Sequence, residues 1–474
     1  MYTNNTSFPI SDWSAQVKKP NRVKRVFRRL TSCLIFLVLG QTLVAQLTGI
    51  KTIPGDYPNF IAAVAALNLQ GVGPGGVIFD IDSNRIETGV KVVLSIPNNP
   101  PAADRPLVFR KKGTGNNPRF EGATGVSTAS DGIIVLNGLD YVTFDGIDLS
   151  DTRFGNNNVT TRMEWGFAFL KKSSTDGCHH NTIKNCNISL HQSHPGSHCI
   201  YVANHTVSNT TPLVLTSFDG TNSYNHFYNN TLENCFTGYH IVGYQSPSPF
   251  DLYDIGNEIG VDGQSTHRSS VTKFGSSSNS GNGRGVWTLY QNNLKVSHTY
   301  INNSGGLPLG GDITGIYIGE ANNANIDVFN DTITIFLYSS IISNTLTVNS
   351  GVLGTGNTIN VHHNLVTGCQ GNILIGYAIS GGASYLNIHH NELSNNTNGR
   401  AYGIRANGSN GLPEEIKMYD NVVFNNSTAG FGYTGYSHLF EVNGNTKKTS
   451  VYNNLAYNNV FNTSGGLFGC TVTV

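Results

Sequence analysis

The sequence predicts an all-β protein, a single-stranded parallel β-helix that starts with one capping helix. The first observation is a phrase that returns: residues 359–368 read INVHHNLVTG, and residues 386–395 read LNIHHNELSN. The second is composition, because the chain is rich in Asn and has 54 Gly, two residue types that favour turns and disfavour helices. The third is that only residues 58–70 show a convincing helical pattern. A strand phrase that returns about every 30 residues is typical of one β-helix coil.

The repeated phrase defines positions that face the core and a position where the chain turns. Ile359 and Val361 precede Asn364, and Val366 follows it, an alternation that turns all three apolar side chains inward. The same arrangement surrounds Thr299, Asp331, Asn391 and Asn421, and it is partial around Ile147, Cys186, Asn230 and Asn454. From Thr299 onward these reference residues lie 27 to 33 residues apart. We expect the Asn side chains of neighbouring coils to form a hydrogen-bonded ladder.

Residues 1–45 have the pattern of a signal peptide with a long basic leader. A region rich in Lys and Arg at 18–29 precedes the apolar run Leu34 to Leu39, and cleavage after Ala45 would suit a signal peptidase. The stretch from Leu30 to Ala45 is too short and too interrupted for a membrane-spanning helix. The leader therefore predicts a secreted protein or one held at the bacterial outer surface.

The remaining residues, 46–474, are predicted to form the β-helix. Residues 58–70 form its capping helix, which begins near Asn59, ends at Gly71 and covers the open apolar end of the strand stack. We expect five side chains to share its apolar face: Phe60, Ile61, Val64, Ala65 and Leu67.

Two later stretches depart from the repeat. Residues 236–293 lose the register and include a Ser/Gly/Asn-rich segment at 270–285, so we expect a loop-rich insertion there. The last ten residues, GGLFGCTVTV, end in a strand pattern without a polar cap, so we expect a C-terminus that is truncated or uncapped.

Six cysteines remain once Cys33 is removed with the leader: Cys178, Cys186, Cys199, Cys235, Cys369 and Cys470. Export permits disulfides, and the spacing does not fix their pairing. Buried single thiols that act as small apolar residues are the equal alternative.

Three phrases carry a resemblance to known proteins. They are GDYP at residues 55–58, RPLVFRKKGTGNNPRFEG at 105–122 and LDYVTFDGIDLS at 139–150. With these phrases the chain resembles right-handed parallel β-helix proteins of the pectin-lyase-like superfamily, and most of all the exported β-helix proteins of Bacteroidetes-type bacteria. The resemblance extends over most of residues 47–474 and implies a right-handed coil.

The pectinases of that superfamily have catalytic phrases that this chain lacks. The methylesterase phrases QDTL, DFIFG and GRPW are absent, and so are the NTD, DD and GHG of polygalacturonases. Asp145 and Asp148 flank a turn and are the candidate carboxylate pair for glycoside hydrolysis, although Asp is also an ordinary turn residue. The sequence leaves open whether the protein is an enzyme.

The position two residues before each reference residue points outward and is mostly aromatic or His. We expect these residues to form a ligand-binding stripe: Tyr228, Phe329, His362, His389, Tyr419 and Tyr452. Aromatic side chains are common in binding sites, but they also favour strand surfaces without any ligand. The imidazoles of His362, His363, His389 and His390 gather on two coils and are the candidate metal ligands.

The sequence therefore favours an exported, non-catalytic protein that binds polysaccharide or a cell-surface glycan along this stripe. One alternative is a polysaccharide lyase or glycoside hydrolase that acts on acidic polysaccharide, and another is a rigid spacer within a larger surface protein. No cofactor is expected, calcium being the alternative because pectate lyases use clustered Asp to hold it. Nucleic acid is excluded, because 12% of the residues are charged and the net charge is zero.

Overall fold

The computed structural model describes residues 45–472 except 127–130, 152–160, 193, 264–267, 276–281, 306–312, 337–343, 350–354, 371–373, 381–383, 400, 408–412, 429–436, 444–445 and 461–466. Residues 1–44 of the predicted signal peptide lie outside the described residues. The chain from Gln46 to Val474 forms one compact unit. In the part of the chain that is described, no helix is long and apolar enough to cross a membrane.

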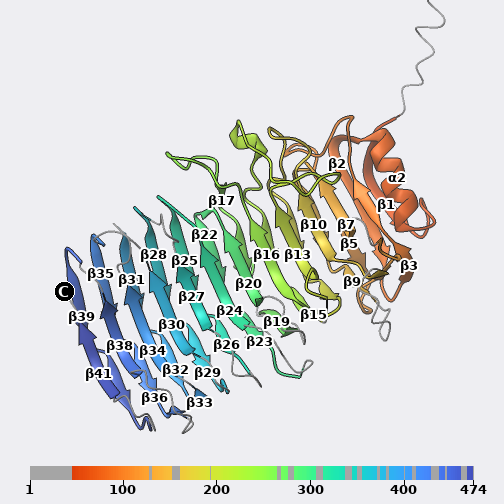
Figure 1. The fold of residues 1–474 in the computed structure, drawn as a ribbon. Coiled ribbons are helices and arrows are strands. Elements are labelled where there is room, and N and C mark those ends of the chain that lie inside the picture. Colours follow the sequence, from red (N-terminus) through yellow and green to blue (C-terminus); the bar gives the residue numbers. More distant parts are fainter. Residues whose placement is uncertain are drawn as a thin grey trace, which may run out of the picture. The chain divides into compact units, whose positions relative to one another are not determined.

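The unit is built from three sheets of parallel strands that run side by side along the coil axis (Figure 1). Sheet A contains β1 (Leu47–Ile53), β2 (Val72–Asp82), β5 (Leu107–Lys112), β8 (Val142–Asp145), β11 (Thr182–Lys184), β14 (His226–Tyr228), β18 (Glu258–Gly260), β22 (Leu294–Ser297), β25 (Asn325–Phe329), β28 (Thr358–His362), β31 (Tyr385–His389), β35 (Glu415–Tyr419) and β39 (Thr449–Tyr452). Sheet B contains β3 (Ile86–Val90), β6 (Arg119–Gly122), β9 (Asp148–Ser150), β12 (Asn187–Ser189), β15 (Thr231–Cys235), β19 (Ser269–Phe274), β23 (Thr299–Asn302), β26 (Thr332–Thr334), β29 (Leu365–Thr367), β32 (Glu392–Ser394), β36 (Val422–Phe424) and β40 (Leu455–Tyr457).

Sheet C contains β4 (Val92–Leu94), β7 (Gly132–Asn137), β10 (Trp165–Leu170), β13 (His198–Ala203), β16 (Thr237–Val242), β20 (Gly283–Leu289), β24 (Ile313–Gly319), β27 (Asn344–Asn349), β30 (Leu374–Ser380), β34 (Ala401–Asn407), β38 (Ser437–Asn443) and β41 (Leu467–Val472). Two short pairs, β17 (Asp254–Ile255) with β21 (Gln291–Asn292) and β33 (Thr397–Gly399) with β37 (Ser427–Thr428), and the 3-10 turn η2 (Phe218–Gly220) complete the elements. Consecutive strands such as β10, β11 and β12 supply one strand to each sheet, so the predicted parallel β-helix is confirmed.

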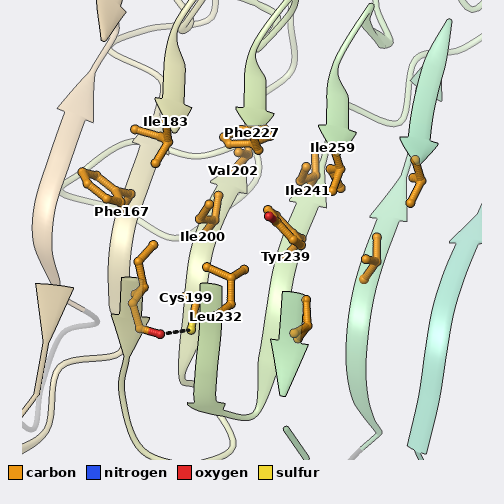
Figure 2. Close-up of a cluster of buried hydrophobic side chains, with 14 of the residues drawn as sticks. Phe167, Ile183, Cys199, Ile200, Val202, Phe227, Leu232, Tyr239, Ile241 and Ile259 are labelled. Carbon is orange, nitrogen blue, oxygen red and sulfur yellow. Dashed lines mark hydrogen bonds between the residues drawn. The ribbon is translucent and has the colours of Figure 1, made fainter. Parts of the chain in front are cut away.

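The positions that the repeat assigned to the core are buried. Ile359, Val361 and Val366 are all 0% exposed, and Ile359 pairs in register with Ile326 and Leu386 of the neighbouring coils. Figure 2 shows the same arrangement in earlier coils, where apolar side chains of neighbouring strands lie in rows inside the helix. Each coil therefore buries its apolar face against the coils before and after it.

The predicted Asn ladder is confirmed at the turn between sheets A and B. The Nδ2 atoms of Asn364, Asn391 and Asn421 each donate to the Oδ1 atom of the next ladder residue, at 3.1, 3.1 and 2.9 Å. Asn391 Nδ2 also donates to Val361 O at 2.7 Å. Two further ladders, which the sequence did not reveal, contain Asn181, Asn225 and Asn257, and Asn396, Asn426 and Asn459.

The predicted capping helix is α2 (Phe60–Gln70), with Asn59 as N-cap and Gly71 as C-cap at φ +74°. Its buried residues are Phe60, Ala63, Val64 and Leu67, which follow the i, i+3, i+4, i+7 spacing. Two residues expected on this face, Ile61 and Ala65, are exposed instead. They lie one position after Phe60 and Val64, about 100° further around the helix.

The register that was expected to be lost over residues 236–293 continues through the strands described there. The segment carries β16 to β21. Ile259 of β18 pairs with Phe227, and Val271 of β19 pairs with Leu232, so the coil continues in register. Ile259 and Val271 are twelve residues apart in the sequence, whereas Phe227 and Leu232 are five apart. The extra residues between two regular strands hid the repeat.

The five described cysteines, Cys178, Cys186, Cys199, Cys235 and Cys369, are free and buried, while the side chain of Cys470 lies outside the described residues. Two of them occupy ladder positions. Cys186 Sγ accepts from Ile147 N at 3.4 Å, and Cys369 Sγ accepts from Ile335 N at 3.2 Å. In these coils the thiol takes the place of an amide oxygen.

Candidate functional site

The predicted stripe lies on the outer face of sheet A, and five of its six residues stack on one another. Phe329, His362, His389, Tyr419 and Tyr452 are consecutive in the register of β25 to β39. Neighbouring ring centroids are 4.8 to 5.1 Å apart, and neighbouring ring planes differ by 10° or less. Both faces of the His362, His389 and Tyr419 rings are therefore covered by their neighbours. The stripe presents ring edges to solvent, whereas a sugar ring that stacks on an aromatic ring needs an open face.

Tyr228 is separated from the other stripe residues. In the register, Gly260 follows it and Ser297 comes before Phe329. The Tyr228 hydroxyl donates to the Glu258 carboxylate. The structure thus brings together the stripe from Phe329 to Tyr452 and leaves Tyr228 outside it.

Among the four histidines proposed as metal ligands, His362 stacks on His389 and His363 stacks on His390, with ring centroids 4.9 and 4.8 Å apart. His362 Nδ1 and His363 Nδ1 are 2.9 Å apart, as are the Nδ1 atoms of His389 and His390. His362 Nε2 lies 3.0 Å from Asp327 Oδ1. Burial and the neighbouring imidazoles lower the pKa of His389 to about 4. Among the described residues, no group of three or more His, Cys, Asp or Glu side chains is arranged to hold a metal ion.

Asp145 and Asp148 bind turn residues. Asp145 Oδ1 accepts from Asn185 Nδ2 at 2.7 Å. Asp148 Oδ1 accepts from Asn117 Nδ2 at 2.7 Å and from Asn187 N at 2.8 Å. Asp148 also lines a polar cavity of about 470 Å³ at the corner between sheets A and B, together with Asn84, Arg85, Ile86, Lys111, Gly115, Asn116, Asn117, Arg119 and Asn187. Both carboxylates thus have structural partners in the turn.

A second group of aromatic and basic side chains lies on the outer face of sheet C, and the sequence did not predict it. We call it the sheet C cluster; its members are Trp165, His198, Tyr201, His240, Arg284, Trp287 and Tyr317. One row of the register contains Tyr201, His240, Trp287 and Tyr317, and a second contains Trp165, His198 and Arg284. The strands that carry them, β10, β13, β16, β20 and β24, are neighbours in the sheet (Figure 1).

The rings of the cluster pack closely but in varied orientations. Trp165 stacks on Tyr201 with centroids 4.4 Å apart, and His240 meets the Trp287 ring edge to face at 4.5 Å. Tyr201, Trp287 and Tyr317 keep part of their surface exposed. Because its rings do not form one continuous stack, this surface differs from the stripe on sheet A.

Arg284 is the charged centre of the cluster. Its guanidinium lies 4.2 Å from the Trp287 ring centroid and 4.5 Å from that of Tyr317. None of the carboxylates that the structure describes forms an ion pair with it, and its Nε is buried without a hydrogen-bond partner. Burial lowers the pKa of this guanidinium from its ordinary value. A half-buried cation that meets only rings has hydrogen-bonding capacity left for a ligand.

Other polar atoms of the cluster also have no partner in the described chain. They are His198 Nδ1, His240 Nδ1 and Trp287 Nε1, and Thr237 Oγ1, which lies in the row between His198 and Arg284, is unpaired as well. Burial lowers the pKa of His198 to about 3, so its ring is neutral at neutral pH. Buried polar atoms are normally hydrogen-bonded, and a group of unpaired ones on one surface is a common property of ligand sites.

One sequence signal could have revealed these strands. Residues 165–169, 237–241, 284–288 and 314–318 read WGFAF, TGYHI, RGVWT and TGIYI, each with Gly before an apolar residue. A Cβ atom at Gly238 would lie 2.6 Å from Gly285 O, and one at Gly285 would lie 2.6 Å from Gly315 O. Only Gly allows neighbouring coils to approach this closely.

No family model matches the chain, and no curated protein matches it. Among solved structures, the chain is similar to the GH136 lacto-N-biosidase from Eubacterium ramulus, with a TM-score of 0.50, 11% identity, and coverage of 83% of this chain and 64% of that one. The chain thus spans less than two thirds of that structure's length.

Two other solved structures match with lower TM-scores. The A-module of the mannuronan C-5 epimerase AlgE6 from Azotobacter vinelandii gives a TM-score of 0.32 at 10% identity, over 84% of this chain and 94% of that one. A rhamnogalacturonan lyase gives 0.33 at 15% identity, over 86% and 87%. At these identities the likeness concerns the fold alone, and the chain has the right-handed parallel β-helix fold that the resemblance of its sequence implied.

Proposed function

We propose that this chain is an exported protein that binds a carboxylate-bearing polysaccharide on the sheet C cluster. The observation that carries the proposal is Arg284, a part-buried guanidinium that lies over two aromatic rings and has no acidic partner among the described residues. A guanidinium presents parallel N–H groups that match a carboxylate, and burial strengthens such a bond. Export rests on the leader at residues 1–45.

The rings around Arg284 suit the sugar part of such a ligand. Tyr201, His240, Trp287 and Tyr317 come from four successive strands, which lie about 4.8 Å apart. A polysaccharide chain that runs along the coil axis would meet one ring per coil, and Tyr and Trp combine an apolar surface with a polar group. The fold likeness to a lacto-N-biosidase is consistent with a carbohydrate ligand.

The proposal moves the binding surface away from the stripe on sheet A. The stacked faces of His362, His389 and Tyr419 leave no room for a sugar ring between them. The stripe still offers Tyr hydroxyls and His ring nitrogens that can form hydrogen bonds, and a weak glycan contact there would be lost in a Tyr419→Ala variant. The sheet C cluster, in contrast, combines part-exposed rings with an unpaired cation.

The test measures binding of the full chain to three immobilised polysaccharides: polygalacturonate, alginate and a neutral galactan. We expect binding to at least one of the two acidic polymers, weakening with added salt, and at least ten-fold weaker binding by Arg284→Gln. Arg110→Gln is the matched control, because Arg110 already pairs with Asp80 at 2.6 Å. Equal binding of the acidic and neutral polymers, or an Arg284→Gln variant that binds like the wild type, would overturn the proposal. Absence of binding to all three would favour the rigid spacer.

A further inference from the structure

Glu164 lies at the edge of the sheet C cluster. It directly precedes Trp165, the first residue of β10, and its backbone O accepts from His198 N at 2.7 Å. Its side-chain Oε2 accepts from the backbone N–H of Asp131 at 2.8 Å, and its Oε1 lies 3.6 Å from His194 Nε2. The side chain is 14% exposed, so it is held firmly while one part of it reaches solvent.

The carboxyl group of Glu164 faces a second carboxylate. Asp131 is 5% exposed, and its Oδ2 binds Lys91 Nζ at 2.8 Å and Val126 N at 2.9 Å. Its Oδ1 is buried without a hydrogen-bond partner. Burial, and secondarily the Asp131 carboxylate, raise the pKa of Glu164 to about 7. Asp131 is thus the charged group that acts on Glu164, and its Lys91 partner and the imidazole of His194 lie beside the pair.

We infer that Glu164 is a catalytic acid and that the chain hydrolyses a glycosidic bond of the polysaccharide bound on the sheet C cluster. The inference rests on the proposed function, because the cluster has to hold the substrate. It is carried by the geometry of a fixed, partly exposed carboxyl group beside a second carboxylate, at the end of a row of rings. A carboxylic acid that keeps its proton near neutral pH is suited to protonate a leaving oxygen.

The reaction consumes water and balances in two steps. As the bond between the anomeric carbon and the bridging oxygen breaks, Glu164 transfers its proton to that oxygen, which leaves as a sugar hydroxyl. The positive charge on the sugar ring lies near the Asp131 carboxylate. A water molecule then bonds to the anomeric carbon and gives its proton to the Glu164 carboxylate, which restores the acid.

The register sets the distance between the cleaved bond and the anchoring cation. Trp165 and Arg284 occupy the same row of sheet C, three strands apart. At about 4.8 Å per strand, this separation is about 14 Å. The substrate must therefore be long enough to reach from Glu164 to Arg284, and we expect single sugars and disaccharides to resist cleavage.

The test incubates the full chain with each polysaccharide that it binds and measures both new reducing ends and the absorbance of unsaturated sugars. We expect reducing ends without unsaturated products, and a rate that falls as the pH rises past about 7. Glu164→Gln keeps an oxygen that accepts from Asp131 N, so it should fold normally and lose at least 100-fold in rate. Glu233→Gln is the control, because Glu233 pairs with Lys273 at 3.0 Å on sheet B. This variant should cleave the polysaccharide at the wild-type rate.

The outcomes separate this inference from the proposed function. A polysaccharide that is bound but not cleaved overturns the inference and leaves the binding proposal standing. Unsaturated products would also overturn it, since they indicate elimination, as would a Glu164→Gln variant that is as stable and as fast as the wild type. If none of the three polysaccharides is bound, both proposals fail.

Discussion

Asp331 occupies a ladder position where the following coils carry Asn364, Asn391 and Asn421, and we predict that Asp331→Asn stabilises the protein. The side chain is 1% exposed. Its Oδ1 accepts from Thr299 N at 2.8 Å, whereas its Oδ2 is buried without a partner. Burial raises the pKa of this carboxyl to about 8. A charge is therefore unfavourable here at neutral pH.

Two contributions set the size of the effect. A pKa that rises on folding from 3.8 to about 8 costs at most about 4 kcal/mol of unfolding free energy at pH 7. An Asn at position 331 carries no charge, and its amide could donate to Asn364 Oδ1, as the other ladder amides do, for about 1 kcal/mol. We expect a gain in unfolding free energy of about 2 to 4 kcal/mol at pH 7.

The pH dependence follows from the same shift. Because the folded state holds this proton more tightly than the unfolded state, the contribution of Asp331 is fully present below pH 3.8 and is lost as the pH rises towards about 8. The wild type should therefore lose stability between pH 5 and pH 8 relative to Asp331→Asn.

Urea unfolding followed by circular dichroism at pH 5, 7 and 8 measures the difference. The converse change, Asn364→Asp, is the matched control and should destabilise, because it places a carboxyl among amide partners at 3.0 to 3.1 Å. Equal midpoints for Asp331→Asn and the wild type at pH 8 would refute the reasoning. An Asn364→Asp variant as stable as the wild type would refute it as well.

Three other predictions concern buried or stacked groups. Lys171→Met should lower the unfolding free energy by about 3 to 5 kcal/mol, because it leaves the carboxylate of Asp254, which is 0% exposed and 4.0 Å away, without its cation. The double variant that also carries Asp254→Asn should recover this stability. An unchanged urea midpoint in Lys171→Met would contradict the prediction. The pKa of His389 is lowered to about 4, so the unfolded state binds the proton more tightly than the folded state. The stability of the protein should therefore fall as the pH drops from about 7 towards 4, and it should fall less in His389→Phe. An identical pH dependence of the two proteins would contradict this prediction. The five described cysteines should not react with a thiol reagent in the native state and should react in denaturant. Peptide mapping would identify the labelled residues. Labelling of any of the five in the folded chain would contradict their burial.

The sequence predicted the interior of the β-helix well, because every coil needs apolar side chains and a ladder residue at equivalent positions. Ile359, Val361 and Val366 had to be apolar to fill the same space as their counterparts above and below, and Asn364 had to bond the next turn. Such positions repeat, and repetition can be recognised without a structure. The stripe on sheet A lies in register from Phe329 to Tyr452 for the same reason, and its ligand-binding role stays a prediction.

Sheet C was missed because its distance from the repeated phrase varies. Gly238 of β16 follows its reference residue Asn230 by eight residues, whereas Gly166 of β10 follows Ile147 by nineteen. The segments between sheets B and C can lengthen without disturbing the core, since loop length has a small effect on stability. No fixed period therefore connects the side chains of the sheet C cluster, and only the structure brings them together.

Tyr239 and His240 are neighbours on β16, and they show why the sheet C cluster differs from the stripe. Tyr239 points inward, is 0% exposed, and pairs in register with Ile200 and Val286, so the core rule holds at its position. His240 points outward, and its row changes from coil to coil instead of repeating. A repeated row such as the stripe is explained by the stacking of rings on neighbouring coils. Such stacking would be sufficient in a rigid spacer without a ligand. The two rows of the sheet C cluster place an unpaired cation and unpaired ring nitrogens on a few adjacent coils, and buried polar atoms without partners destabilise the coil. Among the described residues of sheet C, the unpaired guanidinium and ring nitrogens lie on β13, β16 and β20, and they are the reason to look for the ligand there.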